Sequence, residues 1–158
     1  MKAIQISLDH QTLQAIENHQ VCYQYPISTA LKGPGEEKGS EQTPRGLHII
    51  RAKIGAGYPK GAVWVSRRFT GEIYTNELAD KHNPRDWILS RILWLRGCQM
   101  DFNRLGNCDT QQRYIYIHGV PDSTPMGIPL SHGCIRMHND AIIELFDWAD
   151  VNTVVNIA

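Results

Sequence analysis

Glycine and proline divide most of this chain into short segments in which apolar and polar residues alternate. The pattern is clearest at residues 3–8, Ala-Ile-Gln-Ile-Ser-Leu, which alternate with a period of two. This period places every second side chain on one face of a β-strand, so that one face can enter a core. Further short segments suited to strands lie at residues 21–25, 47–52, 62–69, 113–118 and 151–157. The sequence therefore predicts a mainly β fold of two packed sheets.

Two segments have the spacing of helices instead. The first follows the Asn83-Pro84 pair, which is typical of a helix start, and it precedes Gly97, which is typical of a helix end. Its apolar residues recur at intervals of three and four, at Ile88, Ile92 and Leu95. We therefore predict one helix over residues 84–96 and a second over residues 140–149.

The length of the chain suits one domain. A chain of 158 residues can bury a core of its own without help from disulfides or metals. The loop rich in glycine and charge at residues 32–42 is too short to link two domains. We predict a single domain over residues 1–158.

Charge and hydropathy exclude several classes of partner. The 16 basic and 16 acidic residues cancel, which argues against nucleic acid or an anionic membrane surface as the main partner. No run of about 18 apolar residues is present, and the N-terminus lacks the apolar segment of a secretory signal. These features predict a cytoplasmic protein that does not enter the membrane.

The residues with catalytic potential gather in two segments. His118-Gly119 ends a predicted strand, and Cys134 follows sixteen residues after His118 within Ser-His-Gly-Cys-Ile-Arg, residues 131–136. A thiol becomes a nucleophile at neutral pH when a nearby imidazole or cation lowers its pKa, and this segment supplies both. Gly133 would let a substrate carbonyl approach the backbone closely. The pattern predicts a cysteine–histidine site for acyl transfer.

A zinc site is the alternative use of the same residues. His118, His132, Cys134 and His138 could in principle surround Zn²⁺. Neither a recognised zinc motif nor a further segment rich in ligands is visible, and the four cysteines form no C-x-x-C pair. We therefore favour the nucleophilic site and expect neither a metal nor a cofactor.

These motifs resemble a known signature. A His-Gly pair followed, after a loop of this length, by Ser-His-Gly-Cys-Ile-Arg resembles the YkuD family, the L,D-transpeptidase catalytic domain. Residues 43–47, Thr-Pro-Arg-Gly-Leu, resemble an upstream element of that family. The resemblance extends over nearly the whole chain and implies a β-sandwich of the L,D-transpeptidase type.

The resemblance also implies roles for individual residues. Cys134 matches the nucleophile that forms the acyl-enzyme, and His118 matches the histidine that activates it. The carbonyl of Gly119 matches the group that holds the imidazole in its useful tautomer. The backbone N–H groups of Gly133 and Cys134 are the expected oxyanion donors.

Four further residues are expected to shape the site. Ser131 and His132 match family residues that line it. Arg136 is expected to support the loop or to pair with a carboxylate of the substrate. Tyr116, which shares a strand face with Tyr114, is a candidate for the substrate groove.

The absence of a signal makes the chain similar to the small cytosolic branch of the family. This similarity implies an L,D-carboxypeptidase that removes the terminal D-alanine from murein tetrapeptides during cell-wall recycling. The tetrapeptide could be free, sugar-linked or nucleotide-linked, and the oligomeric state stays open. One alternative is an L,D-transpeptidase that passes the acyl group to an amine. Another is a catalytically idle module that binds peptidoglycan fragments, which the intact Ser-His-Gly-Cys set disfavours.

Overall fold

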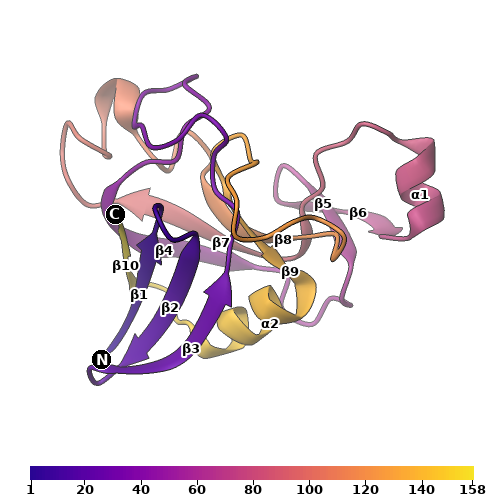
Figure 1. Ribbon diagram of the computed structural model, residues 1–158, viewed down its shortest axis with the longest axis horizontal. Coiled ribbons are helices and arrows are strands. Elements are labelled where there is room, and N and C mark those ends of the chain that lie inside the picture. Colours follow the sequence, from indigo (N-terminus) through magenta and orange to yellow (C-terminus); the bar gives the residue numbers. More distant parts are fainter.

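The computed structural model describes residues 1–158, and the mainly β fold is confirmed (Figure 1). The strands are β1 (Lys2–Ser7), β2 (Thr12–Glu17), β3 (Gln20–Pro26), β4 (Gly46–Ile54), β5 (Ala62–Val65), β6 (Arg68–Ile73), β7 (Leu89–Gly97), β8 (Tyr116–Val120), β9 (Ile135–His138) and β10 (Val154–Ile157). The helices are α1 (Asn76–Lys81), the short 3-10 helix η1 (Gly106–Cys108) and α2 (Asn139–Trp148). The predicted helix at 140–149 is confirmed by α2.

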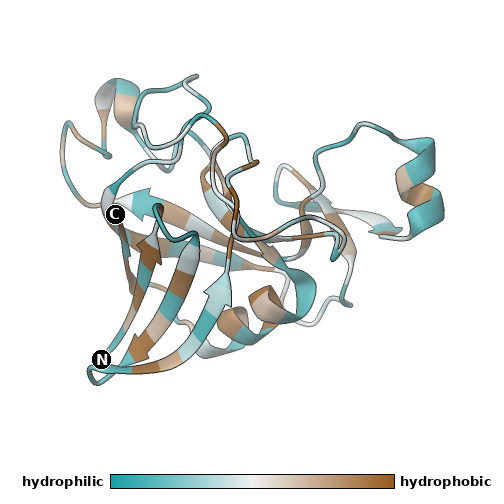
Figure 2. Cartoon of the chain, in the orientation of Figure 1, coloured by the Kyte–Doolittle hydropathy of each residue, from teal (hydrophilic) through white to brown (hydrophobic).

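All the strands are connected in one curled sheet. Its main path runs β3-β2-β1-β10-β4-β7-β5-β6, and β8 pairs with β7 and carries β9 on its other edge. The chain ends meet in this sheet, because β1 pairs in parallel with β10. Figure 2 shows apolar and polar residues alternating along the N-terminal strands, as the period of two predicts.

The main core lies inside the curl. It contains nineteen buried hydrophobic residues, which come from the strands β1 to β4 and β7 to β10, from neighbouring segments and from the inner face of α2. A smaller cluster of Ala62, Trp64, Ile92 and Tyr116 lies apart from it, and Cys134 packs against this second cluster. Neither α1 nor α2 combines the length and the apolar sequence that a helix crossing a bilayer needs.

The helix predicted over residues 84–96 is wrong. Residues 89–97 form β7, which pairs with β4, β5 and β8 near the middle of the sheet. Leu93 and Leu95 enter the main core, whereas Ile92 joins the smaller cluster. A strand buried on both faces is apolar at almost every position, so its residues also match helical spacing. Pairing with the neighbouring strands therefore makes this segment a strand rather than a helix.

Two predicted strands also differ from the structure. Residues 62–69 form a hairpin of β5 and β6 rather than one strand, because the chain turns at Ser66 and Arg67, both with positive φ (47° and 65°). A two-residue turn with positive φ at both positions matches the twist of the flanking strands. The strand expected at 113–118 begins only at Tyr116, after Tyr114 with a φ of 56°.

Candidate active site

Cys134 and His118 line the same cavity, which has a volume of about 540 Å³. This volume is within the range typical of pockets for small ligands. The lining residues come from the β5–β6 hairpin, the loop before β7, β8 and its approach, and β9 with the segment that leads into it. They are Ser66, Arg67, Asp86, Ile88, Tyr114, Tyr116, His118, Ser131, His132, Cys134 and Arg136.

Parallel pairing of β8 with β9 brings the two predicted catalytic segments together. Ile117 pairs with Ile135 and His118 pairs with Arg136, which places Cys134, just before β9, beside Tyr116. The backbone N–H of Tyr116 donates to the Cys134 sulfur at 3.3 Å. The sequence predicted that the segments with His118 and Cys134 lie close together, and the pairing of β8 with β9 explains how they do.

The tautomer of His118 follows from its only hydrogen bond. Its Nδ1 lies 2.7 Å from the carbonyl oxygen of Gly119, and a carbonyl oxygen can only accept. Nδ1 therefore carries the proton, and the lone pair on Nε2 is available to accept one. His118 is only 2% exposed, so its ring is fixed beneath the cavity.

Gly119 has a steric reason to be glycine. A Cβ atom at this position would lie 2.5 Å from the carbonyl oxygen of Leu89 on the neighbouring strand β7. A side chain would therefore push β8 away from β7 and displace the carbonyl that orients His118. The role implied for Gly119 has a matching geometry here.

The lowered thiol pKa expected from the sequence is not found in the structure. Burial raises the pKa of Cys134 to about 11, although the N–H of Tyr116 acts in the opposite direction. Burial also lowers the pKa of His118 to about 4. Consistently, the thiol of Cys134 donates to the carbonyl of Tyr114 at 3.5 Å. The resting pair is therefore a neutral thiol and a neutral imidazole.

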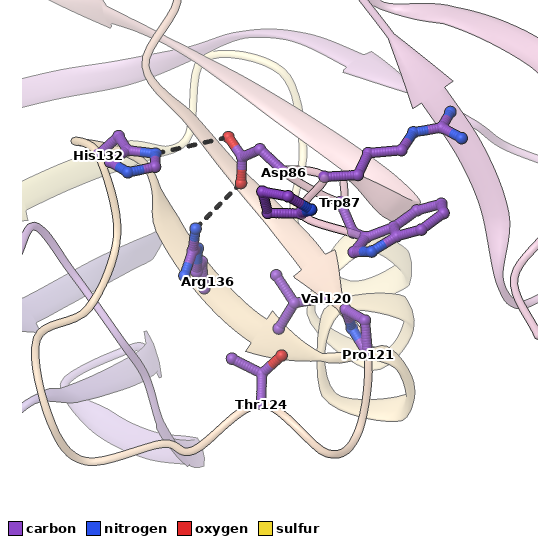
Figure 3. Close-up of a pocket in the computed structure, with 9 residues that line it drawn as sticks. Asp86, Trp87, Val120, Pro121, Thr124, His132 and Arg136 are labelled. Carbon is purple, nitrogen blue, oxygen red and sulfur yellow. Dashed lines mark hydrogen bonds and ion pairs between the residues drawn. The ribbon is translucent and has the colours of Figure 1, made fainter. Parts of the chain in front are cut away.

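Asp86 adds to the effect of burial on the pKa of Cys134, whereas Arg136 acts in the opposite direction. Its carboxylate lies 3.0 Å from the Arg136 guanidinium and 3.9 Å from His132 Nδ1 (Figure 3). Both side chains point toward Asp86, whose negative charge offsets that of the Arg136 guanidinium. Asp86 lies at the start of the helix that was predicted over residues 84–96, and nothing in the sequence indicates this contact.

The cluster of Asp86, His132 and Arg136 also lines a second cavity. This neighbouring space of about 390 Å³ includes Trp87 and Thr124 (Figure 3). These three residues are thus common to the linings of the two cavities. Arg136 supports its own loop as well, through a contact of 3.5 Å to the carbonyl of Leu130.

Hydrogen bonds to Ser131 fix the loop that carries Cys134. The Ser131 hydroxyl donates to the carbonyl of Cys134 at 2.6 Å and accepts from the N–H of Gly133 at 3.2 Å. Gly133 has a φ of 135°, which favours glycine. Of the two amides expected to stabilise an oxyanion, that of Gly133 is thus already paired, whereas that of Cys134 has no protein acceptor.

Thr43 connects the upstream motif to the same loop. Its hydroxyl donates to the carbonyl of Gly133 at 2.9 Å and accepts from the N–H of Ala30 at 3.0 Å, and the side chain is fully buried. The Thr-Pro-Arg-Gly-Leu segment therefore acts as a support beneath the catalytic loop. The motif is recognisable in the sequence, whereas its contact with Gly133 depends on the tertiary fold.

The structure separates the residues of the alternative zinc site. His138 Nε2 lies 2.8 Å from the carbonyl of Thr124, on the loop after β8, and His132 points toward Asp86. The structure contains no group of three or more His, Cys, Asp or Glu side chains placed to hold a metal ion.

Tyr116 and Tyr114 both line the cavity, as considered from the sequence. The Tyr116 hydroxyl accepts a hydrogen bond of 2.7 Å from Arg67. Burial raises the pKa of Tyr116, which keeps the hydroxyl protonated at neutral pH. Arg67 was not among the predicted site residues, because no local motif connects a hairpin turn to a distant cysteine.

A curled β-sheet with a cysteine and a histidine lining one cavity is the arrangement of a cysteine-dependent catalytic domain. Comparison with protein families agrees: residues 1–157 match the model described as YkuD, the L,D-transpeptidase catalytic domain. The chain belongs to this family.

Relatives and solved structures support the assignment. The YkuD protein of Bacillus licheniformis is 26% identical over 155 residues, which cover 98% of this chain and 64% of that protein. An L,D-transpeptidase structure from Xylanimonas cellulosilytica superposes with a TM-score of 0.61 at 23% identity, covering 99% of this chain and 60% of that one. An L,D-transpeptidase from Mycobacterium smegmatis gives 0.58 at 20% identity, with 99% and 58% covered. The chain thus spans less than two thirds of the length of these proteins.

Proposed function

We propose that this chain is an L,D-carboxypeptidase that releases the terminal D-alanine of murein tetrapeptides through an acyl-enzyme on Cys134. The observation that carries the proposal is the shared cavity of Cys134 and His118, with a proton on His118 Nδ1 and a free lone pair on Nε2. Family membership supports peptidoglycan peptides as the substrate class.

The first half-reaction forms a thioester. The sulfur of Cys134 attacks the carbonyl at the L-centre of the diamino acid while its proton passes to His118 Nε2. The unpaired N–H of Cys134 is the donor for the developing oxyanion. The C–N bond then breaks, and the imidazolium returns the proton to the amine of the departing D-alanine.

The second half-reaction consumes water. His118 takes a proton from a water molecule, which attacks the thioester. The C–S bond then breaks, and the imidazolium of His118 returns the proton to the sulfur and restores the thiol. The products are the tripeptide and free D-alanine. Because burial favours the neutral form of both groups, the thiol proton has to pass to His118 for the attack to occur.

Transfer to an amine is the second candidate, and the adjacent cavity favours it. That cavity shares Asp86, His132 and Arg136 with the catalytic one, so an acceptor amine placed there would compete with water. The amine then attacks the same thioester, and a new peptide bond forms.

We also propose a cytoplasmic location for the protein, and cell fractionation with an antibody against it tests this location.

Mass spectrometry of the products separates the two outcomes. The protein is incubated with a murein tetrapeptide, with and without millimolar D-methionine as an amine acceptor. Tripeptide and free D-alanine should dominate in both reactions, and the Cys134→Ala protein should form neither. Dominance of the exchanged tetrapeptide would replace the carboxypeptidase with a transpeptidase.

A further inference from the structure

Arg67 projects from the turn of the β5–β6 hairpin into the lining of the catalytic cavity. It contacts three aromatic residues. Its guanidinium donates to the Tyr116 hydroxyl at 2.7 Å, and its Cζ lies 4.5 Å from the centre of the Trp94 ring and 5.1 Å from that of Tyr114. These contacts restrict the side chain before any ligand binds.

The charge of Arg67 has no partner of opposite sign. Two arginines line the catalytic cavity, and Arg136 is paired with Asp86 at 3.0 Å. Arg67 contacts no carboxylate, and its only hydrogen bond uses one of the five N–H groups of the guanidinium. A restrained guanidinium with free donors has the geometry to bind a carboxylate through two parallel hydrogen bonds.

Tyr116 relates this cation to the nucleophile. Its backbone N–H contacts the Cys134 sulfur, and its hydroxyl contacts Arg67. The guanidinium therefore lies about one tyrosine side chain away from the sulfur. In a peptide that loses its last residue, the terminal carboxylate is three bonds from the carbonyl under attack. It is thus the substrate carboxylate nearest to the reacting atoms.

We propose that Arg67 binds the terminal carboxylate of the departing residue and thereby restricts this enzyme to cleavage at a free C-terminus. The inference rests on the proposed function, because it assumes a peptide whose last residue leaves from an acyl-enzyme on Cys134. Arg67 is then a specificity-determining residue, and the aromatic residues around it fix its position.

The experiment compares a tetrapeptide that has a free C-terminal carboxylate with the same peptide ending in an amide. The measured quantity is kcat/KM for release of D-alanine or D-alanine amide, which does not depend on whether water or an amine consumes the thioester. The wild type should prefer the acid by about 10- to 100-fold, the usual effect of a charged hydrogen-bonded pair. In Arg67→Gln the acid should lose this factor, and the amide should keep its rate.

Arg68→Gln is the matched control. Arg68 is the next residue of the hairpin, and it is exposed and does not line the cavity. Its replacement therefore removes the same charge without changing the lining of the cavity. Arg68→Gln should keep the preference for the acid. Arg67→Lys, which keeps the charge but not the fork of donors, should retain part of it.

Other outcomes overturn the inference without touching the proposed function. These are a wild type that does not distinguish acid from amide, and an Arg67→Gln variant that keeps the preference or loses both activities equally. A second measurement needs no turnover. It compares the affinity for the intact tetrapeptide of the Cys134→Ala protein with that of the double variant Cys134→Ala/Arg67→Gln, which should bind about 10-fold more weakly or worse. If the wild type releases no D-alanine while this affinity difference persists, the proposed function fails and carboxylate binding by Arg67 stands.

Discussion

The two walls of the catalytic cavity are built differently. We define the inner wall as residues 116–138, which include β8, β9 and the loop with Cys134, and the outer wall as residues 66–88, from the hairpin turn to the loop before β7. The inner wall contains buried residues on both strands, whereas no residue of the outer wall is buried. In Figure 1 the outer wall, with α1, projects at the end of the molecule away from the N-terminal strands.

The difference indicates a division of labour. The inner wall places the proposed nucleophile, its proposed base and the carbonyl that orients this base on paired strands and a loop held by hydrogen bonds, where positions vary little. The outer wall contributes Arg67 and Asp86, whose contacts are made by side chains at or near the surface. Changes to the inner wall should therefore affect the chemical step, and changes to the outer wall should affect substrate choice.

Removal of the proposed nucleophile should have the largest effect. Cys134→Ala should abolish release of D-alanine and leave thermal unfolding nearly unchanged, because the side chain is small and belongs to a loop. Cys134→Ser should also be nearly inactive, since an alcohol is a much weaker nucleophile beside a base suited to sulfur. Turnover close to the wild type in either variant would place the nucleophile elsewhere.

The two histidines of the cavity should differ, because they belong to different environments. His118→Ala should lower the rate of acylation by a factor on the order of 10²–10⁴, the usual contribution of a positioned acid–base group. His132→Ala should cost less, because His132 is exposed and points toward Asp86. Single-turnover mass spectrometry of the acyl-enzyme measures both, and the reverse order would reassign the base.

The protonation state of the inner wall can be tested by alkylation. With a pKa of about 11, Cys134 holds roughly 10²-fold less thiolate at pH 7 than an ordinary cysteine. Its rate with iodoacetamide should therefore rise about tenfold for each pH unit and level off only near pH 11. The exposed Cys22 is the internal reference and should react faster at pH 7. A rate for Cys134 that levels off below pH 8 would show that an ion pair forms in the resting enzyme.

The contrast between the walls also describes what the sequence could predict. His118, Cys134 and the neighbours of Cys134 are recognisable because their chemistry lies in two short segments with a fixed spacing. Arg67 and Asp86 belong to the outer wall and reach the site only through the tertiary fold, so no local pattern indicated them. The wrong expectation for the thiol pKa has the same origin, because the burial of Cys134 in the fold is the main cause of its raised pKa, and Asp86 adds to that effect.

The fold was predictable where one face of a strand is exposed. β1 alternates clearly because only one of its faces enters the core. β7 is buried on both faces, so its sequence lacks that alternation, and the prediction of a helix there failed. The start of α1 has a capping threonine, Thr75, but the helix is short and buries no residue, so no apolar periodicity indicates it.

The smallest expected effect comes from removing one hydroxyl that supports the inner wall and one that belongs to the outer wall. Thr43→Val, beneath the loop of the inner wall, leaves the carbonyl of Gly133 and the N–H of Ala30 without their partner in a buried place. This should lower the free energy of unfolding by about 1–3 kcal/mol and slow acylation, because the catalytic loop loses its support.

Thr75→Val is the matched change on the outer wall, where the hydroxyl accepts from the N–H of Leu78 at 3.0 Å and caps α1. Loss of a cap costs a helix about 1 kcal/mol, but α1 buries no residue, so it can fray without opening the core. Amide hydrogen exchange should therefore accelerate within α1 alone, while the acylation rate stays within about twofold of the wild type. If Thr75→Val slowed acylation as much as Thr43→Val, the outer wall would share in positioning the nucleophile, and the separation of roles between the walls would be wrong.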